Sequence, residues 1–260
     1  MSTLNVVHPN AQIGNNVTIS PFCVIAEDVV IGDDCWIGPN VSIMDGVRIG
    51  KNCKVFPGAI LGATPQDLKY EGEESILEID DNVIIREYCT INRGTKANYK
   101  TYIGKNTLIM AYVHVAHDCI IGNNCILSNN VNLAGHIELA PYVIVGGLTA
   151  VHQFVNIGIH SFIGGGSLVR KDVPPFVKAA REPLSYVGIN GVGLRRRGFD
   201  SDQIKTIQDI YRILFVKGYN TKQALQYIQD EFPTSDEKST ILEFIQQSNR
   251  GLMRGFSRVG

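Results

Sequence analysis

The sequence predicts a mainly β protein, in which a parallel β-helix of hexapeptide repeats is followed by a small C-terminal α-helical domain. The first observation is a period of six: from residue 7 to 174 there are 28 positions six residues apart, and 25 of them hold Ile, Leu or Val. The second is that Gly often follows this aliphatic residue, while a small or β-branched residue stands four positions after it. Neither strand alternation nor helical periodicity explains a period of six, whereas a short strand and a tight turn, repeated, does.

The repeat domain is predicted to span residues 1–175, up to the end of the period at Val173-Pro174-Pro175. Three repeat positions lack the aliphatic residue and hold Asp67, Glu73 and Ala97. Residues 64–78 and 93–102 should therefore leave the coil as two excursions, because the register resumes after each of them. In repeat proteins such insertions often gather at the binding face.

The turns and the six cysteines complete the repeat. Gly after the aliphatic residue is expected to permit the turn backbone. Every cysteine stands at the small position four residues after an aliphatic one, which predicts a buried packing role rather than a disulfide or a reactive thiol. These residues are Cys23, Cys35, Cys53, Cys89, Cys119 and Cys125.

Residues 176–260 are predicted to form the helical domain. The apolar spacing predicts a first helix capped by Asp200 or Ser201 and stopped by Gly218, a second from Thr221 to before Pro233, and a third around Ile241. This domain is too small for a large core of its own, so we expect it to pack on the coil or on a neighbouring molecule.

Composition and charge limit the class of protein. No segment approaches the roughly 20 apolar residues that span a bilayer, and the N-terminus lacks signal-peptide features, so we expect a cytoplasmic protein. The net charge of −1 divides into −8 for residues 1–90 (5 basic, 13 acidic) and +7 for residues 91–260 (19 basic, 12 acidic). The basic second part suits an acidic partner or anionic substrate, or else an ordinary solvated surface. No nucleic-acid partner is expected.

Polar residues gather on one edge of the predicted coil. Known hexapeptide-repeat proteins are left-handed with three hexapeptides per coil, so residues 18 apart should stack about 4.8 Å from each other. Asp118 and His136 then form one column, and His117, Gly135 and Gln153 form a second. His152 and His114 lie beside them, although His114 taken alone fits a structural histidine better than a functional one.

Several motifs of the chain resemble one family of hexapeptide acyltransferases. The motifs are HVAHDC (114–119), LAGH (133–136), GGLTAVHQF (146–154), QDLKY (66–70) and LRRRGF (194–199). They are similar to those of the UDP-N-acetylglucosamine O-acyltransferases, which catalyse the first step of lipid A biosynthesis. The resemblance covers essentially the whole chain, including the C-terminal helices.

This resemblance implies three catalytic residues. His117 matches the general base that takes the proton from the glucosamine 3-hydroxyl as this oxygen attacks an acyl thioester; an imidazole suits the task because its ordinary pKa lies close to neutral pH. Asp118 matches the acid that orients the imidazole. The Gly135 N–H matches the donor to the developing oxyanion.

The resemblance also implies the substrate-binding residues. Asp67 and Lys69 match positions that hold the sugar and phosphate, and Gly165 matches the position that measures the acyl chain. The remaining matches are His114, His136, His152 and Gln153 in the pocket, and Asn190, Arg196 and Arg197 at the nucleotide. The chain departs from the family at Asn92, where members have His.

The implied partners are UDP-N-acetylglucosamine, a 3-hydroxyacyl chain on the phosphopantetheine of an acidic acyl carrier protein, and two further copies in a homotrimer. No metal and no resident cofactor is implied. Two enzymes of other specificity remain as alternatives. The UDP-3-O-acylglucosamine N-acyltransferase usually carries an extra N-terminal domain, whereas here the repeats begin at Val7. A zinc carbonic-anhydrase-like coil would need a third His where Gln153 stands. A non-catalytic coil would not explain the clustered motifs.

Overall fold

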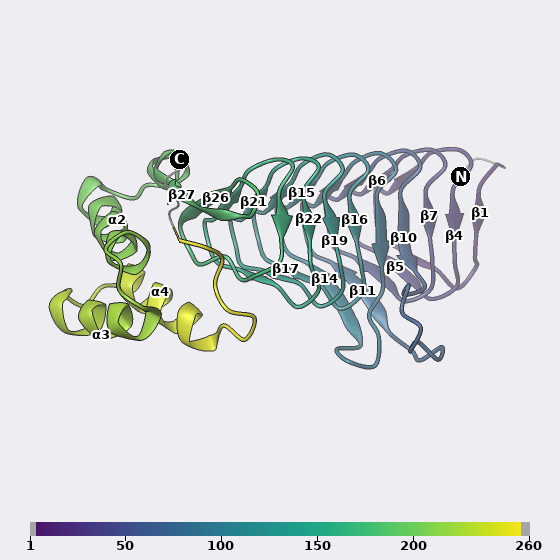
Figure 1. Ribbon diagram of the computed structural model, residues 1–260. Helices are drawn as coiled ribbons and strands as arrows, with labels where there is room; N and C mark the ends of the chain where they lie inside the picture. The colour runs from purple at the N-terminus through teal and green to yellow at the C-terminus, as the bar shows by residue number, and fades with distance from the viewer. Residues whose placement is uncertain (1–3, 256–260) are drawn as a thin grey trace.

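The structure, a computed structural model, describes residues 4–255. It shows a long coil of stacked turns with a group of helices at its C-terminal end (Figure 1). Within the described range, the strands of the coil form three sheets of nine, eight and ten strands, here called sheets 1, 2 and 3. All their pairings are parallel except the last, between β26 and β27.

From β1 to β25 consecutive strands belong to different sheets, so each of these coils contributes one strand to each sheet. Sheet 1 contains β1 (Val6–Val7), β4 (Val24–Ile25), β7 (Ser42–Ile43), β10 (Ile60–Ala63), β13 (Thr90–Asn92), β16 (His114–Val115), β19 (Asn132–Leu133), β22 (Ala150–Val151) and β25 (Leu168–Val169). Sheet 2 contains β2 (Gln12–Ile13), β5 (Val29–Ile31), β8 (Val47–Ile49), β11 (Ile76–Ile79), β14 (Lys100–Ile103), β17 (Ile120–Ile121), β20 (Glu138–Leu139) and β23 (Asn156–Ile157). Sheet 3 contains β3 (Thr18–Ile19), β6 (Trp36–Ile37), β9 (Lys54–Val55), β12 (Ile84–Ile85), β15 (Leu108–Ile109), β18 (Ile126–Leu127), β21 (Ile144–Val145), β24 (Phe162–Ile163), β26 (Val177–Ala180) and β27 (Ser185–Ile189).

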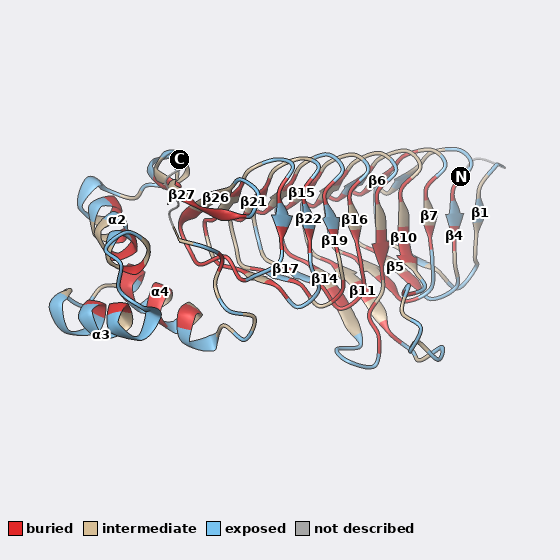
Figure 2. Ribbon diagram, in the orientation of Figure 1, coloured by how far each residue is buried: buried red, intermediate tan, exposed pale blue. Residues whose placement is uncertain are grey.

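The register confirms the predicted coil of three hexapeptides. Val115 pairs with Leu133, and Leu133 with Val151, so residues 18 apart lie side by side. From Ile25 onward the aliphatic residue of every repeat is buried, and the buried residues follow the inside of the coil along its length (Figure 2). All six cysteines are free and buried in this core, as predicted.

The turns differ from the prediction in where the unusual backbone lies. The positive φ angle occurs three residues after the aliphatic one, usually at Asn, Asp, His or an aromatic residue; Asp118 and His136 both have φ of 60°. The Gly directly after the aliphatic residue is needed for space instead. A Cβ on Gly122, for example, would lie 2.6 Å from the backbone nitrogen of Pro141 in the next coil.

Both excursions leave the coil where a strand of sheet 1 leads to sheet 2, which we call corner 1–2. They project from the same side of the coil (Figure 1). Each ends earlier than predicted: residues 76–78 already belong to β11 and residues 100–102 to β14. The reason is that the two returning segments pair with each other, Ile76 with Lys100 and Leu77 with Thr101.

The helical part contains α1 (Gly191–Arg196), α2 (Ser201–Phe215), α3 (Thr221–Glu231) and α4 (Asp236–Gln247). Asp200 is the N-cap of α2, which settles the choice left open above, while the six-residue α1 has no helical period and was not predicted. The coil continues past residue 175, because β26 pairs with β24. Two hydrogen bonds fix the helices to the coil: the Tyr211 hydroxyl donates to the Pro175 carbonyl, and the Ser248 hydroxyl donates to Asp172. No helix in the described range is long and apolar enough to cross a membrane.

Candidate active site

His117 and Asp118 form a hydrogen-bonded pair at corner 1–2, on the turn after β16. The His117 Nδ1 lies 2.7 Å from Asp118 Oδ2. Both residues are buried, Asp118 almost completely. Asp118 stands at the left-handed position of this turn, with a φ of 60°.

The carboxylate of Asp118 accepts four hydrogen bonds in all, three of them from the second excursion. Its Oδ1 accepts the N–H groups of Thr95 and Asn98, and its Oδ2 accepts the Thr95 hydroxyl beside His117. Burial alone would raise the pKa of Asp118, but the bonds from His117 and Thr95 outweigh burial and lower it. The carboxylate is therefore held ionised and in one orientation. The sequence motifs did not identify Thr95, because only the folded excursion brings this residue to Asp118.

Gly135 lies against the ring of His117, one coil further on. A Cβ at this position would lie 2.7 Å from His117 Cε1 and 2.8 Å from Nε2, so only glycine leaves room for the ring. Its N–H donates no hydrogen bond to any residue between 4 and 255. At corner 2–3, where sheet 2 leads to sheet 3, the equivalent N–H is closed by a side chain, as at Lys105, whose N–H donates to Asn123. The Gly135 N–H thus remains available to a substrate oxygen beside the His117 ring.

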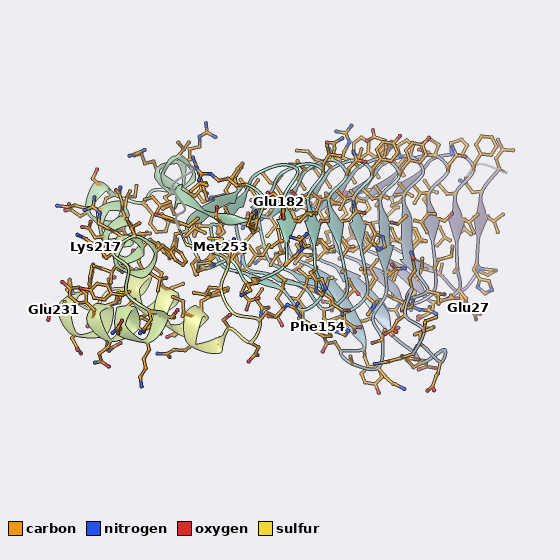
Figure 3. All side chains as sticks on the ribbon, in the orientation of Figure 1. Glu27, Phe154, Glu182, Lys217, Glu231 and Met253 are labelled. Atoms are coloured by element: carbon orange, nitrogen blue, oxygen red, sulfur yellow. The ribbon has the colours of Figure 1, made fainter. Side chains whose placement is uncertain are left out.

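The other predicted pocket residues lie around this pair. The His136 ring stands edge-on to His117 and stacks on Phe154, with centroids 5.0 and 4.5 Å apart; Phe154 lies on the side of the coil from which the excursions project (Figure 3). Burial lowers the pKa of His136, which favours its neutral form. His114 accepts or donates a 2.8 Å hydrogen bond with the Thr90 hydroxyl, and burial lowers its pKa also. His152 and Gln153 are exposed on the next coil.

The first excursion carries Asp67 and Lys69, and its base is tied to the coil. Asp67 is half-buried near His136 and accepts the Lys69 N–H, whereas the Lys69 side chain is exposed. Buried Asn92 donates its amide to the carbonyls of Ala63 and Thr64, where the excursion begins. Asn92 thus ties the base of the first excursion to the coil.

Asn190, Arg196 and Arg197 lie at a different corner. Asn190 is buried, donates to the His160 carbonyl and caps α1, so it positions the arginines of this helix. The Arg197 guanidinium lies 5.0 Å from the ring centroid of Tyr142, on which His160 stacks. The three residues thus belong to corner 2–3, away from His117 in the same chain.

Gly165 lies at the third corner, 3–1, where sheet 3 leads to sheet 1. A Cβ there would lie 3.1 Å from the Gly147 carbonyl oxygen. Gly165 lies just before the strand of Leu168. This strand and the strand of His114 both belong to sheet 1 and are three coils apart, which is about 14 Å at the usual strand spacing. One chain therefore joins His117, Asp118, Gly135, His136 and the excursions into one cluster. The residues expected to bind the nucleotide and to measure the acyl chain lie at the other two corners.

His117, Asp118 and His136 could in principle reach one metal ion, since their donor atoms lie within 4.8 Å of one another. However, each oxygen of Asp118 already accepts two hydrogen bonds, and His117 Nδ1 is directed at this carboxylate. A metal would have to displace these donors. The arrangement instead suits a histidine base with an orienting carboxylate, beside a backbone N–H that can donate to an oxyanion.

The fold and this cluster together define a hexapeptide-repeat transferase, and comparisons with known proteins agree. A family model described as bacterial transferase hexapeptide (six repeats) matches residues 28–63 and 100–135. Residues 172–253 match the model of the second domain of UDP-N-acetylglucosamine O-acyltransferase.

The chain belongs to the acyl-[acyl-carrier-protein]–UDP-N-acetylglucosamine O-acyltransferase family and is an acyltransferase. A relative with this name from Thiobacillus denitrificans is 44% identical over 250 residues, which are 96% of this chain and 97% of that protein. One from Xanthomonas oryzae is 47% identical over 251 residues, 96% and 95% of the two chains. A crystal structure of a UDP-N-acetylglucosamine acyltransferase from Bacteroides fragilis has a TM-score of 0.96 and 48% identity over 98% of this chain and 100% of that one. The coil is thus the left-handed parallel β-helix predicted.

Proposed function

We propose that the protein transfers a 3-hydroxyacyl chain from acyl carrier protein to the 3-hydroxyl of UDP-N-acetylglucosamine, as the first step of lipid A biosynthesis. The relatives named above support the two substrates, and the His117–Asp118 pair is the observation that carries the chemistry. The same relatives favour this reaction over the N-acyltransferase and zinc-enzyme alternatives. We also propose that the reaction takes place in the cytoplasm.

In the proposed mechanism His117 acts through Nε2, because its Nδ1 is bonded to Asp118. Nε2 takes the proton of the sugar hydroxyl while this oxygen forms a bond to the thioester carbon. The Gly135 N–H donates to the oxyanion of the tetrahedral intermediate. The intermediate then collapses, the carbon–sulfur bond breaks, and the leaving thiolate takes the proton from the His117 imidazolium. Asp118 stabilises this imidazolium and does not itself take the proton.

The division of the binding residues among three corners supports a homotrimer. Corner 3–1 carries a ridge of exposed apolar residues along the coil: Phe22 (57% exposed), Tyr88 (57%), Tyr112 (55%) and Leu148 (72%). Such a ridge is costly in water and suits burial against other copies of the chain. In a trimer of parallel coils, corner 1–2 of one subunit would face the nucleotide and chain-length residues of its neighbour, which would complete each site. No metal or resident cofactor takes part in this proposal.

An acyl-transfer assay tests the proposal. Purified protein is given UDP-N-acetylglucosamine and 3-hydroxyacyl carrier proteins of increasing chain length, and mass spectrometry identifies the product. We expect an O-acylated nucleotide with one preferred length, and a roughly 10²–10⁴-fold lower kcat for His117→Ala, the usual effect of removing a general base. Acylation only of an amino-sugar nucleotide would favour the N-acyltransferase instead, and near-normal turnover of His117→Ala would remove this residue from its role.

A further inference from the structure

We propose that Thr95 is a positioning residue of the reaction, acting through Asp118 on His117. This inference rests on the function proposed above. It gives the second excursion a part in the chemistry, because the Thr95 hydroxyl and backbone N–H hold the Asp118 carboxylate, which in turn holds the His117 base.

The geometry joins Thr95 to both oxygens of the carboxylate. Its N–H donates to Asp118 Oδ1 at 3.0 Å, and its hydroxyl donates to Oδ2 at 2.7 Å. Thr95 is buried, so water does not replace these bonds easily. Two donors from one residue fix the plane of the carboxylate as well as its position, in the way that a bidentate partner does.

The hydroxyl bond also controls how strongly Asp118 interacts with the base. The Thr95 hydroxyl and His117 Nδ1 both lie 2.7 Å from the same oxygen. The hydroxyl therefore competes with the imidazolium for Oδ2 while restricting the rotation of the carboxylate. Without it, Oδ2 would bind the imidazolium more strongly, but the ring would be less well oriented towards the substrate.

The position of Thr95 depends on the first excursion. The N–H of Lys96, the next residue, donates to the Glu73 side chain, and the Lys96 ammonium pairs with Glu71. On the other side, the Arg93 guanidinium donates to the Tyr70 hydroxyl. The segment that carries Asp67 and Lys69 is thus connected through the second excursion to the catalytic pair.

Three variants test the role of the hydroxyl. Thr95→Val keeps the shape and the backbone N–H but removes the hydroxyl donor, whereas Thr95→Ser keeps the donor. Thr107→Val is the matched control, since Thr107 is also buried and its hydroxyl also donates one bond, to the Gly122 carbonyl at corner 2–3. Steady-state kinetics are measured across pH, with thermal unfolding for each variant.

We expect Thr95→Val to lower kcat by roughly tenfold, the loss of one hydrogen bond to a charged group, with KM for the nucleotide sugar unchanged. The acid limb of its kcat profile, which reports protonation of the coupled His117–Asp118 pair, should move to higher pH. The titratable groups that face Asp118 are His117, His136 and, in the core, Cys119. Thr95→Ser should restore most of the rate, and Thr107→Val should lose stability without a shifted limb.

A second measurement needs no substrate. Nuclear magnetic resonance of ¹⁵N-labelled histidine rings reports the tautomer and titration of His117, which Thr95→Val should change and Thr107→Val should not. Unchanged His117 spectra together with an unchanged pH limb would overturn the positioning role of Thr95. If the spectra change as expected but the wild type acylates no UDP-N-acetylglucosamine, the inference stands and the proposed substrate is wrong.

Discussion

The contact between Gly135 and the His117 ring allows a prediction in which only the position of the base changes. Gly135→Ala keeps the backbone N–H, and the backbone at 135 does not have a positive φ, so alanine fits the turn without strain. Its methyl group, however, would lie 2.7 Å from His117 Cε1. Carbon atoms pack at about 3.5 Å or more, so the ring must move by roughly 0.8 Å.

We expect this displacement to lower kcat by roughly 10²-fold, because a misplacement of about 1 Å of a reacting group has an effect of that size. The cost in the free energy of unfolding should be near the lower end of the usual 1–3 kcal/mol for overpacking, since the ring lies at the edge of the coil and can yield. The assay is acyl transfer at saturating substrates, with thermal unfolding of the same preparation.

Gly147→Ala is the stability control for this experiment. Gly147 occupies the same position of another hexapeptide, and its added methyl would lie 3.1 Å from a backbone oxygen, Asn129 O. If Gly135→Ala turned over within about threefold of the wild type while remaining folded, the ring position would not matter. The assignment of His117 as the base would then be wrong.

Three further predictions concern the other corners. Arg197→Ala should raise KM for the nucleotide sugar about tenfold with little change in kcat, because Arg197 is proposed to bind the diphosphate; an effect on kcat alone would contradict its placement. Leu148→Glu should dissociate the proposed trimer, as seen by light scattering, because it places a charge on the apolar ridge that the subunits would bury; an intact trimer would exclude this ridge from the interface. Burial and the nearby Arg197 lower the pKa of His160 to about 4 from 6.5. The folded state therefore resists protonation that the unfolded state accepts, so stability is complete above pH 6.5 and falls as pH decreases towards 4. His160→Phe should flatten the acid decrease of the melting temperature over this interval; an unchanged slope would remove His160 as its cause.

The coil could be predicted from sequence because one short rule is repeated many times. Each aliphatic residue at a period of six must be buried, and every repeat gives the same answer, so errors at single positions do not matter. The cysteines illustrate this, since their position in the repeat alone placed them in the core. The turn glycines illustrate the limit: the sequence shows that Gly is preferred, but not whether backbone angle or the space beneath the next coil requires it.

The candidate site was predicted only in part, for a physical reason. The columns His117–Gly135 and Asp118–His136 follow from the repeat, because 18 residues separate neighbours along the coil axis. Thr95 lies 23 residues before Asp118, and this separation is not a multiple of the coil length. Its contact exists only because an excursion leaves the coil and folds back on it. No periodic rule describes such a segment.

The excursions nevertheless keep the coil in register, and this explains how a repetitive scaffold can carry a single site. The step from Leu61 to Ile79 is 18 residues and that from Ile91 to Ile103 is 12, where an ordinary hexapeptide step is 6, so the insertions add 12 and 6 residues. Both emerge at corner 1–2 and return to pair with each other. The coil before and after them therefore continues undisturbed, and the corner they cover is the one in which a carboxylate is withdrawn from water. A plain coil would leave Asp118 hydrated at its edge; covered by the second excursion, it is fixed beside His117.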